Sequence, residues 1–518
     1  MKREGLIKQM AEEKRPWDLL IIGGGATGLG VAVDASSRGY RVLLVEQHDF
    51  AKATSSRSTK LVHGGVRYLQ QGDVSMVVEA LHERGRLWRN APHLVKDMRF
   101  IIGNYRWWER PFYTIGLCCY DLLAGRLGLG RSLPLSKKQT LKELPGLLHD
   151  HLRGGVVYHD GQFDDSRMAI TLMQSAHDHG AICINYMKVT SLIKNDSGKI
   201  CGAALEDTLE GGTYEVNVKG VVNATGVYVD DIMQMDKPES RKKVRPSQGV
   251  HIVVDAAFLG GNSALMIPKT RDGRVLFGVP WHGKAVLGTT DTPLNENSLE
   301  PKPLDEEIDF ILDQAGQYLT RKPKRSDVLS VFAGLRPLAA PTHSDSKKTK
   351  EISRNHKIYV SDSGMLTITG GKWTTYRQMA EEAVNKVAAL IGLEPRACVT
   401  RKMQLHGYRE EVDRSVWDYV YGSDADQIAA LIENDASLGE LLHIGYTFRV
   451  AHVIWAVREE MAQTVEDVLA RRVRALFMDA RAAMEMAPRV AAIMGKDKNW
   501  ETEQVKNFTS LAKNYILA

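Results

Sequence analysis

The chain has 518 residues, of which 43% are hydrophobic and 25% are charged, and its formal net charge at pH 7 is +5. This composition excludes a disordered chain, and the length is too great for a single core, so two or three domains are expected. The slight positive charge permits binding to anionic substrates or to a membrane surface but proves neither, and nucleic-acid binding has no support beyond this charge. The five cysteines form no C-x-x-C motif and the histidines show no metal-ligand spacing, so neither a disulfide framework nor a metal site is expected.

No targeting or membrane-spanning segment is predicted. The residues up to Arg15 are charged and lack the apolar centre of a secretory signal. No stretch approaches the roughly 20 uncharged apolar residues that a helix needs to cross a bilayer. We therefore expect an intracellular protein with nothing transmembrane.

A strand, a helix and a second strand are predicted in close succession near the N-terminus. Residues 19–22 form a short apolar run, as a buried parallel strand should. A G-x-G-x-x-G motif follows at once, residues 29–36 have the pattern of a helix, and residues 41–45 have that of a second strand. This order is the dinucleotide-binding fingerprint in its proper context.

Each glycine of the fingerprint has a physical task, and so does the acid that follows it. Gly23 makes the tight turn, Gly25 lets the backbone approach a pyrophosphate, and Gly28 lets the helix pack on the strand. The free N–H groups of the helix N-terminus face the phosphates. Glu46, at the end of the second strand, is placed to accept hydrogen bonds from an adenosine ribose.

The rest of the chain mixes helices with short strands. In order, we expect a small-residue segment at 51–65, a helix at 73–90, an aromatic and glycine-rich region of weak periodicity at 96–135, a strand at 156–159, a helix at 165–179, a hairpin region at 188–219, a strand ending in a glycine turn at 221–226, several short strands at 247–292, a helix at 301–318, strands at 358–360 and 366–369, and a helix at 373–391. After about residue 400 the pattern changes, and residues 415–495 are predicted to be nearly all helical, for example over 465–477. A separate helical domain is therefore expected.

Two features favour FAD over NAD as the dinucleotide. The regular alternation of strand and helix breaks into hairpins, and strand-like pieces of the nucleotide domain return late, near 221–226 and 366–371. Residues 367–377 also predict a strand, a Gly-Gly turn and a helix start, which Thr374 or Thr375 is able to cap. A helix N-terminus stabilises the negative charge that a flavin gains at its N1–C2=O edge on reduction.

Three segments carry a specific resemblance to a known family. Residues 49–69, 333–338 and 370–377 together resemble the FAD-dependent, membrane-associated glycerol-3-phosphate dehydrogenases of the aerobic bacterial type. The similarity covers nearly the whole chain, including the helical tail. Arg57 departs from a run that is usually made of small residues, and Trp373 stands where an aliphatic residue is common.

The patterns and the resemblance together predict an α/β (α+β) architecture. We expect an FAD-binding Rossmann-like domain, a discontinuous mixed-sheet substrate domain and a C-terminal all-α domain. The oxidoreductase region is expected over 15–400 and the helical domain over 401–518. Within the former, the FAD-binding parts are expected at about 15–95, 150–245 and 330–400, and the substrate-binding parts at about 96–149 and 246–329.

The reaction that the resemblance implies is oxidation of sn-glycerol 3-phosphate to dihydroxyacetone phosphate. A hydride would pass from C2 to N5 of a non-covalently bound FAD, and the electrons would then pass to a membrane quinone. Three alternatives remain: an oxidase that uses oxygen and releases hydrogen peroxide, a related FAD oxidoreductase that acts on an amino or 2-hydroxy acid, and a non-catalytic flavoprotein whose tail recruits a partner. The cation cluster described next argues against the last two.

A small dianionic substrate needs several cations, because charge-assisted hydrogen bonds must replace the water around its phosphate. The family pattern places Arg67, Arg336, Arg354 and Lys372 around the substrate, with Tyr68 as a hydrogen-bond partner. Arg354 has a second interpretation, since it lies in the charged stretch 347–357 and could be a solvated surface residue.

Three residues are candidates for catalysis. His63 lies beside two glycines that let the backbone approach the flavin, and His251 opens an apolar strand. Either imidazole is able to accept the hydroxyl proton, and the sequence does not choose between them. Arg336 is the third candidate, as a cation next to the reacting atoms.

The cofactor-binding residues follow from the fingerprint and from the family segments. They are Gly23, Gly25, Ala26, Thr27, Gly28, Glu46, Thr54, Ser55, Ser58, Thr59, Lys60, Gly64, Gly65, Ala224, Thr225, Gly226, Gly371, Lys372, Thr374 and Thr375.

Aromatic residues and arginines alternate between residues 104 and 131, which is a composition typical of a membrane interface. A loop-and-helix region on the substrate side is the other interpretation. With a quinone as acceptor, we expect a cytoplasmic protein that binds peripherally to the anionic inner face of the cell membrane. The helical tail is expected to cover the substrate side or to form the interface of a homodimer.

Overall fold

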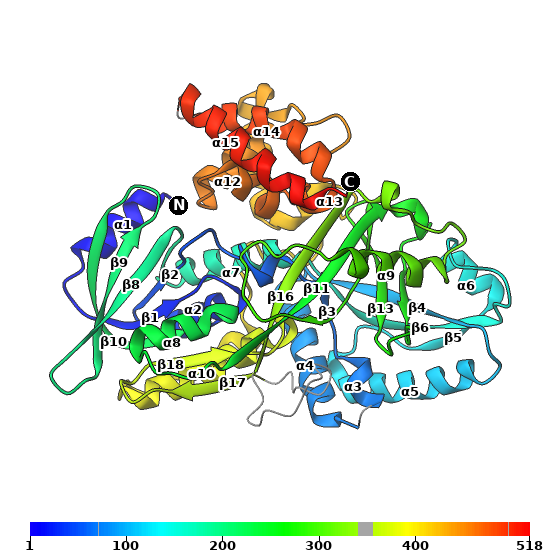
Figure 1. The fold of residues 1–518 in the computed structure, drawn as a ribbon, viewed down its shortest axis with the longest axis horizontal. Coiled ribbons are helices and arrows are strands. Elements are labelled where there is room, and N and C mark those ends of the chain that lie inside the picture. The colour runs from blue at the N-terminus through cyan, green and yellow to red at the C-terminus, as the bar shows by residue number, and fades with distance from the viewer. Residues whose placement is uncertain (71, 340–355, 496, 518) are drawn as a thin grey trace.

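The computed structural model describes residues 1–70, 72–339, 356–495 and 497–517, without the side chains of Arg67 and Gln70. Two β-sheets lie side by side, and the C-terminal helices gather above the region where the sheets meet (Figure 1). Both chain ends lie on this upper side of the molecule. The arrangement agrees with the predicted α/β architecture and its C-terminal helical part.

The first sheet is built around short apolar strands. It contains β1 (Trp17–Ile22), β2 (Val42–Val45), β7 (Ile182–Ile184), β8 (Met187–Lys194), β9 (Ile200–Asp207), β10 (Thr213–Asn223), β17 (Lys357–Val360) and β18 (Leu366–Thr369). Strands β18, β10, β1, β2 and β7 lie side by side in this order and run parallel, whereas β17, β8 and β9 add antiparallel pairs. Parallel strands are covered on both faces, which explains why β1 is almost entirely buried.

Helices from distant parts of the sequence cover this sheet. Helix α2 (Ala26–Ser37) packs against both α7 (Asp165–Asp178) and α10 (Tyr376–Leu390). The remaining helices before residue 400 are α1 (Arg3–Glu12), α3 (Val66–Gln70), α4 (Val74–Asn90), α5 (Glu109–Ala124), α6 (Lys137–Glu143), α8 (Val229–Asp236) and α9 (Asp305–Gly316).

The second sheet is mostly antiparallel. It contains β3 (Leu61–Val62), β4 (Lys96–Asn104), β5 (Leu133–Ser136), β6 (Gly154–Gln162), β11 (Val244–Asp255), β12 (Ala264–Ile267), β13 (Leu276–Trp281), β14 (Lys284–Gly288), β15 (Thr292–Pro293) and β16 (Ser330–Ala339). One of its faces packs on α4 and α5 through an apolar cluster, and the other packs on α9. Figure 1 shows α5 along the lower edge and α9 above the strands.

Three strands of the second sheet lie in parts of the chain that were expected to bind FAD. Strand β3 pairs antiparallel with β6, β6 also pairs antiparallel with β4, and β16 pairs antiparallel with β11, so all three belong to the second sheet although residues 15–95, 150–245 and 330–400 were expected in the FAD-binding part. The region 96–135, where the sequence shows only weak periodicity, contains β4 and α5. Its weak periodicity has a physical reason, because β4 is a largely buried inner strand and α5 exposes apolar side chains.

The described elements after residue 400 are all helical. They are η8 (Thr400–Lys402), η9 (Trp417–Tyr421), α11 (Asp424–Asn434), η10 (Ala436–Gly439), α12 (Val450–Glu459), the π-helix η11 (Asp467–Arg472), α13 (Ala475–Met478), α14 (Ala480–Met494), α15 (Lys498–Ala512) and η12 (Lys513–Tyr515).

The segment 465–477 is mostly helical, as expected, but it is divided into two helices. The chain changes direction at Arg474, whose φ of 68° is left-handed, between η11 and α13. Buried ion pairs across the domain boundary account for the break: Arg472 lies 2.7 Å from Asp49, and Arg474 lies 2.9 Å from Asp165. Four charged side chains buried without partners would be costly, so these pairs tie the helical domain to the first sheet.

Candidate active site

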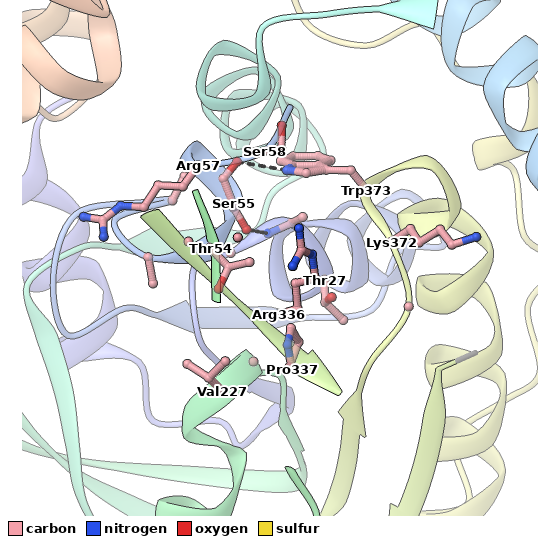
Figure 2. Close-up of a pocket in the computed structure, with 18 of the residues that line it drawn as sticks. Thr27, Thr54, Ser55, Arg57, Ser58, Val227, Arg336, Pro337, Lys372 and Trp373 are labelled. Atoms are coloured by element: carbon pink, nitrogen blue, oxygen red, sulfur yellow. Dashed lines mark hydrogen bonds between the residues drawn. The ribbon is translucent and has the colours of Figure 1, made fainter. Parts of the chain in front are cut away.

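A cavity of about 460 Å³ opens where the two sheets meet, at the carboxyl ends of β1 and β10. Ligands of open α/β sheets bind at this edge of the strands. Side chains from both sheets and from the late Gly-Gly segment line the cavity, and Figure 2 shows Thr27, Thr54, Arg336 and Lys372 around it.

The fingerprint forms the floor of the cavity. A Cβ on Gly28 would lie 1.9 Å from the carbonyl oxygen of Gly23, so only glycine lets α2 start this close to β1. The N–H of Ala26, in the first turn of α2, donates to Ser55 Oγ at 2.9 Å (Figure 2). The other N–H groups of this turn are in position to bind a pyrophosphate.

Glu46 lines the same cavity, and two backbone N–H groups hold its carboxylate in place. Its two carboxylate oxygens accept the N–H groups of Gly24, at 2.6 Å, and of His48, at 2.9 Å. Burial raises the pKa of Glu46, while the two backbone donors oppose this shift. A carboxylate has about four acceptor sites, so capacity remains for the hydroxyls of a ribose.

The small-residue segment forms one wall. Ser55 accepts the indole N–H of Trp373 through its carbonyl oxygen at 2.9 Å, a contact drawn in Figure 2. Thr54 Oγ1 donates to the carbonyl oxygen of Leu335 at 2.6 Å, and so joins this wall to β16.

The Gly-Gly segment closes the opposite wall, but its threonines do not cap the helix as expected. The short helix η7 (Trp373–Thr375) leads into α10, and neither threonine side chain makes a capping bond there. The hydroxyl of Thr374 instead accepts the N–H of His63 at 3.1 Å. This contact joins the loop after β3 to the start of α10.

His251 lies on β11 and is buried. Its Nε2 lies 2.9 Å from Thr59 Oγ1, and its ring stacks on Phe332. Burial lowers the pKa of His251 well below its usual value, and the charges of Lys60 and Arg336 lower it further. Its Nδ1 has no hydrogen-bond partner among the described residues. His63 lines the cavity as well, at the end of β3.

Arg336 lies on β16, in register with Ser247 of the neighbouring β11. Its guanidinium donates to Thr289 Oγ1 at 3.1 Å and lies 3.5 Å from Asp291 Oδ1. Sequence analysis missed both partners, which belong to the run Gly288-Thr-Thr-Asp291 after β14. The only signal for them is a short polar run after an apolar strand.

Other cations stand near the mouth of the cavity. The Lys372 ammonium lies 4.0 Å from the centre of the Tyr68 ring. Arg274 also lines the cavity, paired with Asp272, and was not predicted. The side chain of Arg67 and the whole of Arg354 lie outside the described residues.

Several predicted cofactor residues do not line the cavity itself. Gly28, Gly64 and Thr375 lie behind its surface. Lys60 is fully buried, and its ammonium lies 2.7 Å from Asp165 and 2.8 Å from the carbonyl oxygen of Ser56. Lys60 therefore supports the loop that carries Ser58 and Thr59 instead of facing a ligand.

Asp160, on β6, is a buried acid that sequence analysis missed. Its carboxylate lies 2.6 Å from Arg84, accepts the hydroxyl of Tyr120 at 2.9 Å, and accepts the N–H of Gly64 at 3.2 Å. These contacts hold the His63 loop from below. No local sequence pattern predicts this arrangement, because the partners come from α4, α5 and the loop after β3.

Helix α5 and the turn before it present apolar side chains to solvent. Trp107, Ile115 and Leu122 are 78%, 67% and 80% exposed. Arginines 106, 110 and 126 are exposed beside them. Within the described residues, we find no helix with both the length and the apolar character required to span a bilayer.

Comparisons with known proteins place this architecture in a family. Residues 18–377 match the family model described as FAD dependent oxidoreductase, and residues 366–505 match that of the C-terminal domain of alpha-glycerophosphate oxidase. The chain is 40% identical to a probable mitochondrial glycerol-3-phosphate dehydrogenase of Caenorhabditis elegans, over 96% of this chain and 73% of the relative. It is also 40% identical to the mitochondrial glycerol-3-phosphate dehydrogenase SDP6 of Arabidopsis thaliana, over 97% and 86%.

Solved structures agree with this result. The glycerol-3-phosphate dehydrogenase from Bacillus halodurans, complexed with FAD, superposes with a TM-score of 0.79 at 30% identity and covers 99% of this chain and 98% of that one. The L-alpha-glycerophosphate oxidase from Mycoplasma pneumoniae shares the fold, with a TM-score of 0.57 at 20% identity over 75% of this chain and 98% of that one. The cavity fits FAD through its glycine cradle and Glu46, and this chain belongs to the FAD-dependent glycerol-3-phosphate dehydrogenase family.

Proposed function

We propose that this enzyme oxidises the C2 alcohol of sn-glycerol 3-phosphate to dihydroxyacetone phosphate and passes the electrons to a membrane quinone. The observation that carries the proposal is that Arg336 and the buried His251, on the paired strands β16 and β11, both line the cavity that also holds the fingerprint. When bound, the flavin supplies the two-electron acceptor that takes a hydride from C2 at its N5 atom.

The cations around the cavity would hold the substrate phosphate. Arg336 offers a planar fork of donors, and Lys372 adds a point charge from the other wall. We include Arg67, Arg354 and the hydroxyl of Tyr68 in the same role because of the family pattern. An amino or 2-hydroxy acid would need one cation for its carboxylate, so the cluster favours a phosphorylated substrate.

We assign the proton acceptor to His251, with His63 as the second candidate. The charges of Lys60 and Arg336 and the burial of the ring keep His251 neutral, and a neutral imidazole accepts a proton. Thr59 engages Nε2, so Nδ1 remains for the substrate hydroxyl. A bound phosphate dianion offsets the nearby positive charges and so raises the proton affinity of the ring.

The remaining residues that line the cavity would hold FAD. Ala26 and Thr27 carry the N–H groups for the pyrophosphate, and Glu46 accepts the ribose hydroxyls. Ser55, Ser58, Thr59 and Gly65 form the wall beside the flavin, with Gly371 and Thr374 opposite.

Quinone is the proposed acceptor because a quinone dissolves in the bilayer and α5 presents an apolar, arginine-flanked surface. We therefore propose peripheral attachment to the anionic inner face of the cell membrane. An oxidase is less favoured, since relatives at about 40% identity are named dehydrogenases and the oxidase neighbour shares only the fold.

Anaerobic reduction of the flavin tests the proposal. Rapid bleaching of the visible flavin band by sn-glycerol 3-phosphate, and none by glycerol, is the expected result. The Arg336→Ala variant should lose bleaching at the same substrate concentration, whereas Arg325→Ala, which removes a partly exposed arginine that pairs with Asp305 and does not line the cavity, should keep it. A yellow protein that this substrate does not bleach would refute the assigned substrate.

A further inference from the structure

Arg57 lies in the wall of the FAD cavity, but its charged group is directed elsewhere. Figure 2 shows the side chain extending away from Thr27 and Arg336. The guanidinium is buried, lies 2.6 Å from Glu300 Oε2 and donates to the carbonyl oxygen of Leu299 at 3.0 Å. A Cβ on Gly334 would come within 2.9 Å of Arg57 Cβ, so the glycine of β16 leaves room for the arginine.

The third member of this cluster comes from the end of the chain. Tyr515, in η12, donates its hydroxyl to Glu300 Oε2 at 3.0 Å and lies 3.2 Å from Arg57 Nη2. The phenol is buried, and this burial raises the pKa of Tyr515. We call the three side chains Arg57, Glu300 and Tyr515 the Arg57 cluster.

A second set of ion pairs lies beside the Arg57 cluster. The other carboxylate oxygen of Glu300 lies 2.8 Å from the ammonium of Lys52, which also lines the cavity and pairs with Glu466. Glu466 immediately precedes η11 and pairs with Arg471 at 2.6 Å. The wall at residues 52–57 is thus held at both ends by groups of the helical domain.

The position of this wall matters for the cofactor. It carries Ser55, whose hydroxyl accepts the N–H of Ala26 in the phosphate-binding turn, and whose carbonyl oxygen accepts Trp373. Because Ser55 contacts both, a shift of Arg57 would therefore displace both the fingerprint and the Gly-Gly segment.

We propose that Arg57 is a positioning residue for FAD, and that Tyr515 makes the helical domain part of the cofactor-binding machinery. The Arg57 cluster holds the cavity wall against the bound dinucleotide, so docking of the C-terminal segment favours FAD retention. Neither side chain touches the reacting atoms in this proposal. The role depends on the cofactor, so its test does not depend on which alcohol the enzyme oxidises.

The test compares two tyrosine variants of the full-length holoenzyme. Tyr515→Phe removes a phenol that donates to Glu300, and Tyr446→Phe removes one that donates to Asp479 at 3.1 Å, within the helical domain. The FAD dissociation constant is measured from the fluorescence of released flavin, and the melting temperature is measured on the same samples. We expect Tyr515→Phe to raise the constant about tenfold, as for loss of a hydrogen bond to a charged group, and Tyr446→Phe to leave it unchanged.

Arg57→Ser and the double variant complete the test. If the cluster acts as a unit, Arg57→Ser raises the FAD dissociation constant at least as much as Tyr515→Phe does. The double variant then has the same FAD dissociation constant as Arg57→Ser alone. Equal FAD dissociation constants for Tyr515→Phe and Tyr446→Phe would overturn the proposal, whatever happens to the melting temperature. So would fully additive effects of the two cluster variants.

Discussion

Arg84 and Asp160 form a buried ion pair, 2.6 Å apart, directly beneath the loop that carries His63. The same carboxylate accepts the hydroxyl of Tyr120 and the N–H of Gly64, so one charge holds a guanidinium, a phenol and the backbone of the loop that carries His63. Burial raises the pKa of Asp160, and Arg84 and the hydrogen-bond donors oppose the shift. The acid therefore links the stability of the second sheet to the geometry of the site.

Replacing this acid should damage both stability and activity. Asp160→Asn leaves the Arg84 guanidinium buried without its counter-charge, which should lower the free energy of unfolding by about 3 kcal/mol or more. Tyr120→Phe removes one neutral donor and should cost about 1 kcal/mol. Urea unfolding measures the loss of unfolding free energy in each of the two variants. A smaller effect for Asp160→Asn than for Tyr120→Phe would contradict the assigned role of the charge.

The two histidine candidates should separate in their kinetics. His251→Asn should lower kcat by about 10²- to 10⁴-fold, the usual contribution of a general base, while His63→Asn should have a clearly smaller effect. Because the pKa of His251 is held well below 6.5, the acid limb of wild-type kcat/KM should lie below that pH. A loss of this size confined to His63→Asn would transfer the proton-acceptor role to His63.

His406 should make stability depend on pH. It lies 2.7 Å from Asp178 of α7 and 3.0 Å from Asp424 of α11, and so joins the two parts of the chain. Partial burial lowers its pKa, but the two carboxylates together raise it to about 10.

A raised pKa in the folded state means that the stabilisation is complete below the unfolded value of about 6.5 and is lost as the pH rises towards 10. Because the ring is partly solvated, solvent screening limits this stabilisation to about 2 kcal/mol. The measurement is the difference in unfolding free energy between wild type and His406→Gln. This difference should be largest near pH 6 and smaller by pH 10. A difference that does not change with pH would contradict the stabilising role of the two His406 ion pairs.

The exposed face of α5 should carry membrane binding. A triple variant, Trp107→Ser, Ile115→Ser and Leu122→Ser, should sediment less with anionic vesicles at low salt, because apolar side chains insert at the headgroup boundary. The control replaces Val360, Val399 and Ile444, which are also exposed apolar residues, by serine. Sedimentation that falls equally in both triple variants, or that is absent in the wild type, would remove α5 as the anchor.

Local sequence patterns are enough to predict the cofactor-binding floor of this protein. The strand, Gly23, Gly28, helix α2 and Glu46 lie within one short stretch of chain, and the geometry that each glycine needs is set by its immediate neighbours. Arg336 and Lys372 were selected for a different reason, because they belong to family segments that are specific. His251 lies outside those segments and became a candidate through the resemblance that covers nearly the whole chain.

Tertiary structure alone decided which distant residues complete the site. Asp160 meets Gly64, Asp291 meets Arg336, and Arg57 meets Tyr515 from almost the other end of the chain. Strand pairing also places β6 and β16 in the second sheet, and the ion pair with Asp165 makes Lys60 a buried support of its loop. These outcomes depend on strand pairing and on the need of every buried charge for a partner, and neither leaves a periodic trace in the local sequence.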